Sequence, residues 1–252
     1  MNTPRNIALI TSTIAPAANT FLLRHSDPEQ RLRDYQQAFT FYCQQVAAGV
    51  FDALIYADNS GYPLDSLVHI ARSHGVSDKI EFISWRTTDN PDNSRFFLEL
   101  KLINEVLARS QLLQQHPDAF LWKITGRYRI ANIGRIVRKK PAKAAALYVN
   151  SRSRPHRFVD FYLAGFTVRA YHELIAIDLQ LHSSKQDDGE RILYRRLHDH
   201  GPARQDIAVR FNVVPRVYGI RGHDGQNYGN WRHTTKYYAR VVANLLFPHW
   251  WI

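Results

Sequence analysis

The chain has 252 residues, of which 45% are hydrophobic, and its formal net charge is +11. A chain of this length and apolar content can bury a sizeable core, and we expect one α/β domain. The single cysteine, Cys43, excludes an internal disulfide and a cysteine-based zinc site. The excess of cations favours an anionic partner such as nucleic acid, anionic lipid or a phosphorylated small molecule, although a basic surface that only keeps the chain soluble has the same composition.

Hydropathy along the chain indicates a cytoplasmic protein. The apolar run near the N-terminus, residues 7–10, is too short for the hydrophobic region of a signal peptide. No stretch reaches the roughly 18 apolar residues of a membrane-spanning helix. We therefore expect any membrane contact to be peripheral, on the inner face of the cytoplasmic membrane.

The main fold signal is an alternation of strand and helix patterns. Short apolar runs, typical of buried strands, cover residues 6–11, 51–57, 80–84 and 120–130, and apolar residues recur at helical spacing over residues 26–46, 64–74 and 99–113. Later in the chain, residues 145–150, 157–168 and 207–217 are strand-like, and residues 171–181 and 188–200 are helical in pattern. This order predicts a mostly parallel sheet flanked by helices, which binds its ligand outside the carboxyl ends of the strands.

A cationic strand at residues 120–130 carries the sequence FLWKITGRYRI. Alternation puts one set of side chains on a core face and the other on a basic wall. The wall comprises Lys123, Thr125, Arg127 and Arg129, and the core face comprises Trp122, Ile124, Tyr128 and Ile130. Residues 123–157 contain eleven Lys or Arg and no Asp or Glu. Such a row suits a diphosphate, although solvated cations on a surface strand would have the same pattern.

Polar side chains follow the first two predicted strands. Thr11, Ser12 and Thr13 close the first strand, and Asp58 and Asn59 follow the second. Two such loops at neighbouring strand ends favour a nucleotide crevice, with Asp58 either accepting from a base or ribose or serving only as a cap or turn residue. The glycine-rich patterns GxxxxGK[ST] and GxGxxG are absent, which argues against a P-loop kinase and a dinucleotide enzyme.

An acidic helix start lies at residues 187–197, DDGERILYRRL. Asp188 and Glu190 are candidates for a general base that takes the proton of a sugar hydroxyl. The alternative is that these acids only interact favourably with the helix dipole.

In this order, these pieces resemble bacterial glycosyltransferases of the GT-A fold, of the kind that assemble lipopolysaccharide, O-antigen and capsule polysaccharide. The resemblance implies a Rossmann-related domain over residues 1–231, with a nucleotide-binding half of about 1–130 and an acceptor and catalytic half of about 131–231. It implies that Glu190, or Asp188 beside it, is the base of an inverting transfer. The implied contacts to a nucleotide sugar are Thr11, Ser12, Thr13, Arg31, Asp58, Asn59, Lys123, Thr125 and Arg127, and the acceptor contacts are His223, Asp224 and Tyr228 in the loop 214–231.

The implied activity is transfer of a sugar from a nucleotide-sugar donor to a glycan or lipid-linked glycan acceptor in cell-surface polysaccharide synthesis. One departure concerns the metal, because Thr125, Gly126 and Arg127 stand where such enzymes commonly carry Asp-x-Asp. We therefore name no metal ligand, leave a divalent cation open, and expect the basic row to stabilise the departing diphosphate. The competing hypothesis is a non-catalytic nucleic-acid-binding protein that uses the basic stretch 123–157. A phosphate-transferring enzyme is a third class, but the clustered metal carboxylates that it needs are not apparent.

The C-terminal tail, residues 232–252, is basic and amphipathic. Its apolar stripe comprises Tyr238, Val241, Val242 and Leu245, and Lys236 and Arg240 are expected opposite. With the terminal PHWWI, this pattern predicts binding to an anionic membrane surface. The alternative is a helix whose apolar stripe docks on the core.

Overall fold

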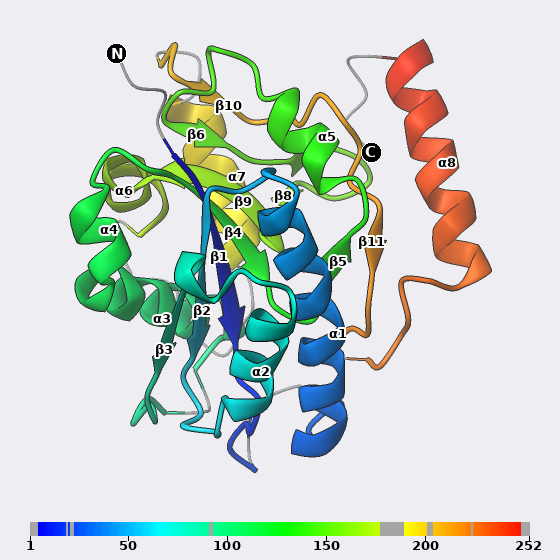
Figure 1. Ribbon diagram of the computed structural model, residues 1–252. Coiled ribbons are helices and arrows are strands. Elements are labelled where there is room, and N and C mark those ends of the chain that lie inside the picture. The colour runs from blue at the N-terminus through cyan, green and yellow to red at the C-terminus, as the bar shows by residue number, and fades with distance from the viewer. Residues whose placement is uncertain are drawn as a thin grey trace.

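The computed structural model describes residues 5–18, 20, 23–90, 93–176, 189–200, 204–222 and 224–247. Its centre is a seven-stranded sheet of order β10-β6-β9-β4-β1-β2-β3 (Figure 1). The strands are β1 (Asn6–Ser12), β2 (Ala53–Asp58), β3 (Ile80–Ser84), β4 (Phe120–Thr125), β6 (Leu147–Tyr148), β9 (Leu163–Thr167) and β10 (Ile207–Ala208). Parallel pairing joins β4, β1, β2 and β3, and also β10 and β6, whereas β9 runs antiparallel to β4 and β6. The predicted α/β arrangement with a mostly parallel sheet is therefore confirmed.

Helices cover both faces of the sheet. The longer ones are α1 (Pro28–Ala47), α2 (Asp65–Ser73), α3 (Arg95–Arg109), α7 (Gly189–His200) and α8 (Trp231–Leu246). The shorter ones are α4 (Gln111–Gln115), α5 (Ile133–Arg138), α6 (Val168–Ala170), the 3-10 turn η1 (Ser77–Lys79) and the π-helical turn η2 (Tyr171–Ile175). Two small antiparallel pairs complete the described elements, β5 (Arg129–Ile130) with β11 (Val217–Tyr218), and β7 (Ser151–Arg152) with β8 (Phe158–Val159). Among the described helices, none is long and apolar enough to cross a membrane.

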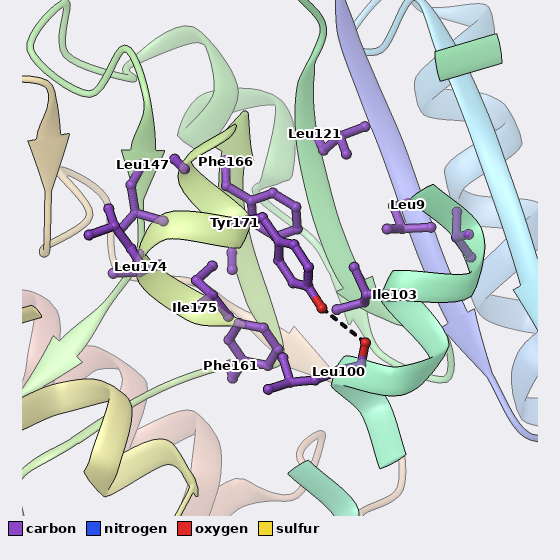
Figure 2. Packing of buried hydrophobic residues seen from close by; sticks show 14 of the residues in the cluster. Leu9, Leu100, Ile103, Leu121, Leu147, Phe161, Phe166, Tyr171, Leu174 and Ile175 are labelled. Carbon is purple, nitrogen blue, oxygen red and sulfur yellow. Dashed lines mark hydrogen bonds between the residues drawn. The ribbon is translucent and has the colours of Figure 1, made fainter. Parts of the chain in front are cut away.

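The alternating side chains of the strands supply two apolar clusters. Ala8, Ile10, Trp122 and Ile124 pack with α1 and α2 on one face, and residues such as Leu9 and Leu121 pack with α3, α7 and η2 on the other. Figure 2 shows the second cluster, in which the Tyr171 hydroxyl donates to the Leu100 carbonyl at 2.9 Å. That bond ties η2 to α3, and so fixes the part of α3 next to Leu100.

Local signals explain where the first helices begin. Asp27 caps α1 by accepting from the Gln30 N–H, and Pro28 occupies the first turn. The helix expected at 99–113 instead begins at Arg95, because the Ser94 hydroxyl accepts from the Phe97 N–H. It also ends early, at Arg109, since Ser110 caps the separate helix α4.

The strand expected at 120–130 ends at Thr125. The prediction that its cations form one basic wall is wrong. Strand β4 lies between β1 and β9, and an apolar cluster covers each of its faces, Leu121 packing on one side and Trp122 on the other, so Lys123 is fully buried. The chain turns at Gly126, whose N–H donates to the Thr11 carbonyl at 2.9 Å. A Cβ at position 126 would lie 2.7 Å from that oxygen, so glycine allows this close approach. Arg129 then belongs to the separate strand β5.

The strands in the second half of the chain are shorter than the hydropathy patterns of the sequence predict. The strand-like stretches 145–150 and 157–168 contribute only β6, β8 and β9, and 207–217 divides into β10 and the start of β11. The helical stretch 171–181 is π-helical over η2, and its remainder from residue 177 lies outside the described residues.

Candidate functional site

A cleft of about 560 Å³ lies at the carboxyl ends of β1, β2 and β4. Its size is typical of a small-molecule site, which spans roughly 300–1,000 Å³. Loops after β1, β2 and β3 form part of its wall, and side chains of α1 and α3 complete it. Seven of the nine residues expected to contact a nucleotide sugar line it, namely Thr11, Ser12, Thr13, Arg31, Asn59, Thr125 and Arg127. The strand-end rule therefore located the cleft from the sequence.

Asp58 lies beneath this cleft and is fully buried. One carboxylate oxygen accepts from the Ser12 hydroxyl at 2.8 Å and the Ile14 N–H at 2.9 Å. The other accepts from the N–H and the hydroxyl of Ser60, at 2.8 and 2.5 Å. Asp58 thus joins the loops after β1 and β2, an arrangement that favours the cap-or-turn alternative, and it is not among the residues that line the cleft.

Arg31 forms the wall on the α1 side. Its guanidinium donates twice to the Thr13 carbonyl, at 2.9 and 2.5 Å, and once to the His25 carbonyl at 2.9 Å. The Tyr35 hydroxyl accepts from the same guanidinium at 3.1 Å and from the Thr13 N–H. Burial lowers the pKa of Arg31, an effect that the neighbouring Tyr35 and Asp58 oppose. This network holds the loop after β1, and Arg31, which is 2% exposed, borders the cleft.

Guanidinium groups outnumber carboxylates around the cleft. The lining cations are Arg31, Arg86, Arg95 and Arg127, and the lining acids are Asp89 and Glu99. Asp89 forms an ion pair with Lys101 at 3.0 Å. Sequence reasoning missed Arg86 and Arg95, although the rule used for the first two strands would have found Arg86, which lies two residues beyond the end of β3.

Glu99 is the carboxylate that sequence reasoning missed. Its Oε1 lies 2.5 Å from Lys123 Nζ and accepts from the Thr11 hydroxyl at 3.0 Å. Within the described part of the chain, Oε2 accepts no hydrogen bond, and 24% of the side chain is exposed. Lys123 also donates to the Phe161 carbonyl and the Thr125 hydroxyl, and burial lowers its pKa against the attraction of Glu99. A buried lysine therefore anchors one carboxylate oxygen of a residue that lines the cleft.

Glu190, the base expected from the sequence, does not line the cleft. It lies in the first turn of α7, where Oε1 accepts from the Phe161 N–H at 3.0 Å. The Phe161 carbonyl accepts from Lys123, and the charge of Glu190 opposes the lowering of the Lys123 pKa by burial, so Glu190 lies near the Lys123–Glu99 pair without lining the cleft. The other expected base, Asp188, lies outside the described residues.

The expected acceptor residues border a different part of the molecule. Asp224 forms an ion pair with Arg221, and Tyr228 packs edge-on against Tyr128 at 5.3 Å and lines a small pocket beneath α8. His223 lies outside the described residues. Their segment reaches the cleft at residues 220–222, where the Ile220 carbonyl accepts from Arg127 Nε at 3.0 Å and the Gly222 carbonyl accepts from the Arg24 N–H.

No group of three His, Cys, Asp or Glu side chains suited to a metal ion is found among the described residues. Asp89 and Glu99 are the carboxylates at the cleft, and each is engaged by a lysine. Four guanidinium groups among the described lining residues could neutralise a bound phosphate.

A scan of the sequence against protein-family models finds no match, and a search of curated proteins finds no similar sequence. The geometry of the cleft is therefore the basis for assigning a function.

Proposed function

We propose that this protein is a GT-A-type glycosyltransferase that moves a sugar from a nucleotide-sugar donor to a glycan or lipid-linked glycan in cell-surface polysaccharide synthesis. One observation carries the proposal. A cleft at the carboxyl ends of parallel strands combines guanidinium groups with a carboxylate, Glu99, that a buried lysine holds by one oxygen. Cations suit the diphosphate of the donor, and a carboxylate suits sugar hydroxyls.

The cationic side of the cleft supports donor binding. Arg31 and Arg127 face the cleft, and both are held by backbone carbonyls, of Thr13 and Ile220 respectively. A guanidinium fixed in this way can meet phosphoryl oxygens with little loss of side-chain entropy. As the bond to the sugar breaks, these cations stabilise the negative charge that develops on the leaving diphosphate.

The reaction follows from this placement as a direct displacement. The acceptor hydroxyl oxygen attacks the anomeric carbon and forms the new glycosidic bond, while the bond from that carbon to the phosphoryl oxygen breaks. The nucleoside diphosphate leaves with the electron pair, and a carboxylate takes the proton of the hydroxyl. We assign this carboxylate to Glu99 in preference to Glu190, because Glu99 lines the cleft and, within the described residues, its Oε2 accepts no hydrogen bond. The oxygen anchored to Lys123 keeps the carboxylate oriented.

A thermal-shift panel of UDP, GDP, CMP and dTDP sugars tests the donor site. A true donor at ~100 times its dissociation constant adds about 2.7 kcal/mol to the free energy of unfolding. The released nucleotide, a nucleoside diphosphate or, from a CMP sugar, CMP, is then measured with and without a glycan acceptor to report transfer. If no nucleotide sugar stabilises the protein, while single-stranded RNA binds with a steep salt dependence, the glycosyltransferase proposal fails in favour of nucleic-acid binding.

A further inference from the structure

Helix α8 is attached to the rest of the protein by its polar face. Asn230 caps it by accepting from the His233 N–H at 2.9 Å. His233 contacts the Tyr228 ring at 5.0 Å, Tyr237 lies beneath Arg216 at 5.6 Å, and Asn244 accepts from Arg210. Arg240, expected opposite the apolar stripe, lines the small pockets between α8 and the body. Positions 233, 237, 240 and 244 follow helical spacing, so they form one face.

The opposite face of α8 is apolar and exposed. Large exposed hydrophobic side chains in the described part of the chain all lie in α8 or directly after it, and they are 47% to 77% exposed. These residues are Trp231, Tyr238, Val242, Leu245, Leu246 and Phe247. No residue of α8 is buried, and the helix stands at the periphery in Figure 1. The apolar stripe therefore does not dock on the core, which was the alternative drawn from the sequence.

The charge around this apolar face indicates the kind of partner that binds it. Residues 225–252 contain three Lys or Arg and no Asp or Glu, within a chain of net charge +11. Arg232 and Lys236 are exposed beside the apolar stripe, whose aromatic members Trp231 and Tyr238 suit the boundary between headgroups and acyl chains. A second protein would have to supply a matching acidic rim, whereas an anionic lipid surface has this charge everywhere.

We propose that α8 docks the protein on an anionic bilayer surface, with its apolar face in the headgroup boundary and its polar face on the body. This proposal is independent of the donor site, since no residue of α8 lines the cleft. The segment 219–230 joins the cleft edge at Ile220 and Gly222 to the start of α8.

Flotation of the full chain with vesicles tests the proposal. Vesicles of phosphatidylcholine with phosphatidylglycerol should bind the protein at least about tenfold more strongly than phosphatidylcholine alone, and ~0.5 M salt should weaken that binding. The double substitution Leu245→Ser and Leu246→Ser should lower the partition coefficient at least about tenfold. Lys236→Gln should lower it roughly fivefold, while the exposed Lys79→Gln, elsewhere on the surface, leaves it unchanged.

The outcomes separate lipid from protein partners. Both leucines are exposed, so the double variant should keep the thermal midpoint of the wild type and its affinity for nucleotide sugars. The proposal is overturned if the wild type does not bind anionic vesicles. It is also overturned if the double leucine variant binds them as strongly as the wild type does. Sedimentation velocity without vesicles supplies the remaining outcome, because self-association that the leucine substitutions abolish makes this face a contact between two copies of the chain.

Discussion

Lys123 Nζ lies 2.5 Å from Glu99 Oε1, and this ion pair joins a fully buried side chain of strand β4 to the α3 wall of the cleft. The lysine has no solvent contact, so its charge depends on that carboxylate and on the Phe161 carbonyl and Thr125 hydroxyl that also accept from it. Removing one partner of a buried pair leaves the other charge uncompensated, which is costly. The pair is therefore both a structural and a chemical element of the site.

Glu99→Gln should make the free energy of unfolding depend on pH over a wider range than in the wild type. Burial already holds the pKa of Lys123 below its ordinary value of 10.5, and loss of Glu99 lowers this pKa further. Because the unfolded chain then binds more protons than the folded protein over a wider range below 10.5, the stability of the variant rises with pH across that range. We expect a loss of about 2–4 kcal/mol at pH ~7 that is partly recovered at pH ~9, measured by urea unfolding.

Glu105→Gln is the matched control for this measurement. Glu105 lies on the same helix, pairs with Arg109 at 2.7 Å and is 41% exposed. We expect it to change stability by less than about 1 kcal/mol, with the pH dependence of the wild type. Equal losses in the two variants at both pH values would show that Lys123 does not depend on Glu99.

A comparison of Glu99→Gln with Glu190→Gln identifies the base. At a temperature where circular dichroism shows both variants folded, we expect Glu99→Gln to lower the turnover of sugar transfer by roughly 100 to 10,000-fold, the usual cost of losing a general base. The dissociation constant of the donor should change little, since Gln has a similar size. Glu190→Gln should mainly lower the free energy of unfolding, because it weakens the hydrogen bond that the Glu190 carboxylate accepts from the Phe161 N–H.

Two other results would reassign this role. A large drop in Glu190→Gln or Asp188→Asn, beside a drop of only a few-fold in Glu99→Gln, would return the base to the acidic helix start that the sequence indicates. Normal turnover in all three variants would leave the inverting mechanism without a base, and a retaining displacement or another reaction class would become the better account.

Arg127→Ala should weaken the binding of a nucleoside diphosphate more than that of the matching nucleoside. The Arg127 guanidinium lines the cleft and is proposed to meet phosphate, and a charge-assisted contact contributes roughly 1.5–3 kcal/mol, or about 10- to 150-fold in affinity. Calorimetry with both ligands measures the difference. Arg33→Ala, an exposed arginine of α1, is the control and should leave both affinities unchanged. An equal loss for both ligands in Arg127→Ala would remove it from the phosphate site.

The location of the cleft could be predicted from the sequence because its signals are local. Apolar runs such as 6–11 mark buried parallel strands, and the polar residues that follow, including Thr11 and Asn59, must then lie at one edge of the sheet. The helix start at Asp27 and Pro28 is equally local, since capping depends on residues within one turn. Seven expected contacts therefore line one cleft.

Features that depend on contacts distant in sequence could not be predicted in this way. A lysine within an apolar strand has the same pattern whether it faces water or a buried carboxylate, and only the placement of β9 and α3 decides that Lys123 is covered. Glu99 has the pattern of an ordinary helix acid for the same reason. Periodicity likewise predicted that α8 is amphipathic, but not that Tyr237 and Arg240 face the body while Leu245 faces outward.

Asp58→Asn separates a positioning role from a ligand contact. The Asp58 carboxylate accepts four hydrogen bonds, from Ser12, Ile14 and Ser60, and lies beneath the cleft with no exposed surface. Asparagine keeps one acceptor oxygen and turns an NH₂ group toward the remaining donors, so buried donors lose their partner at about 1–3 kcal/mol each. We expect a loss of about 2–4 kcal/mol in the free energy of unfolding, together with weaker binding of nucleoside and nucleoside diphosphate alike, because both loops shift. Asp65→Asn, at the exposed start of α2, should change neither quantity.

Urea unfolding and calorimetry on the same samples distinguish the two roles of Asp58. Unchanged stability, with a selective loss of affinity for ribonucleosides over their 2′-deoxy forms, would instead make Asp58 a direct contact to the ribose.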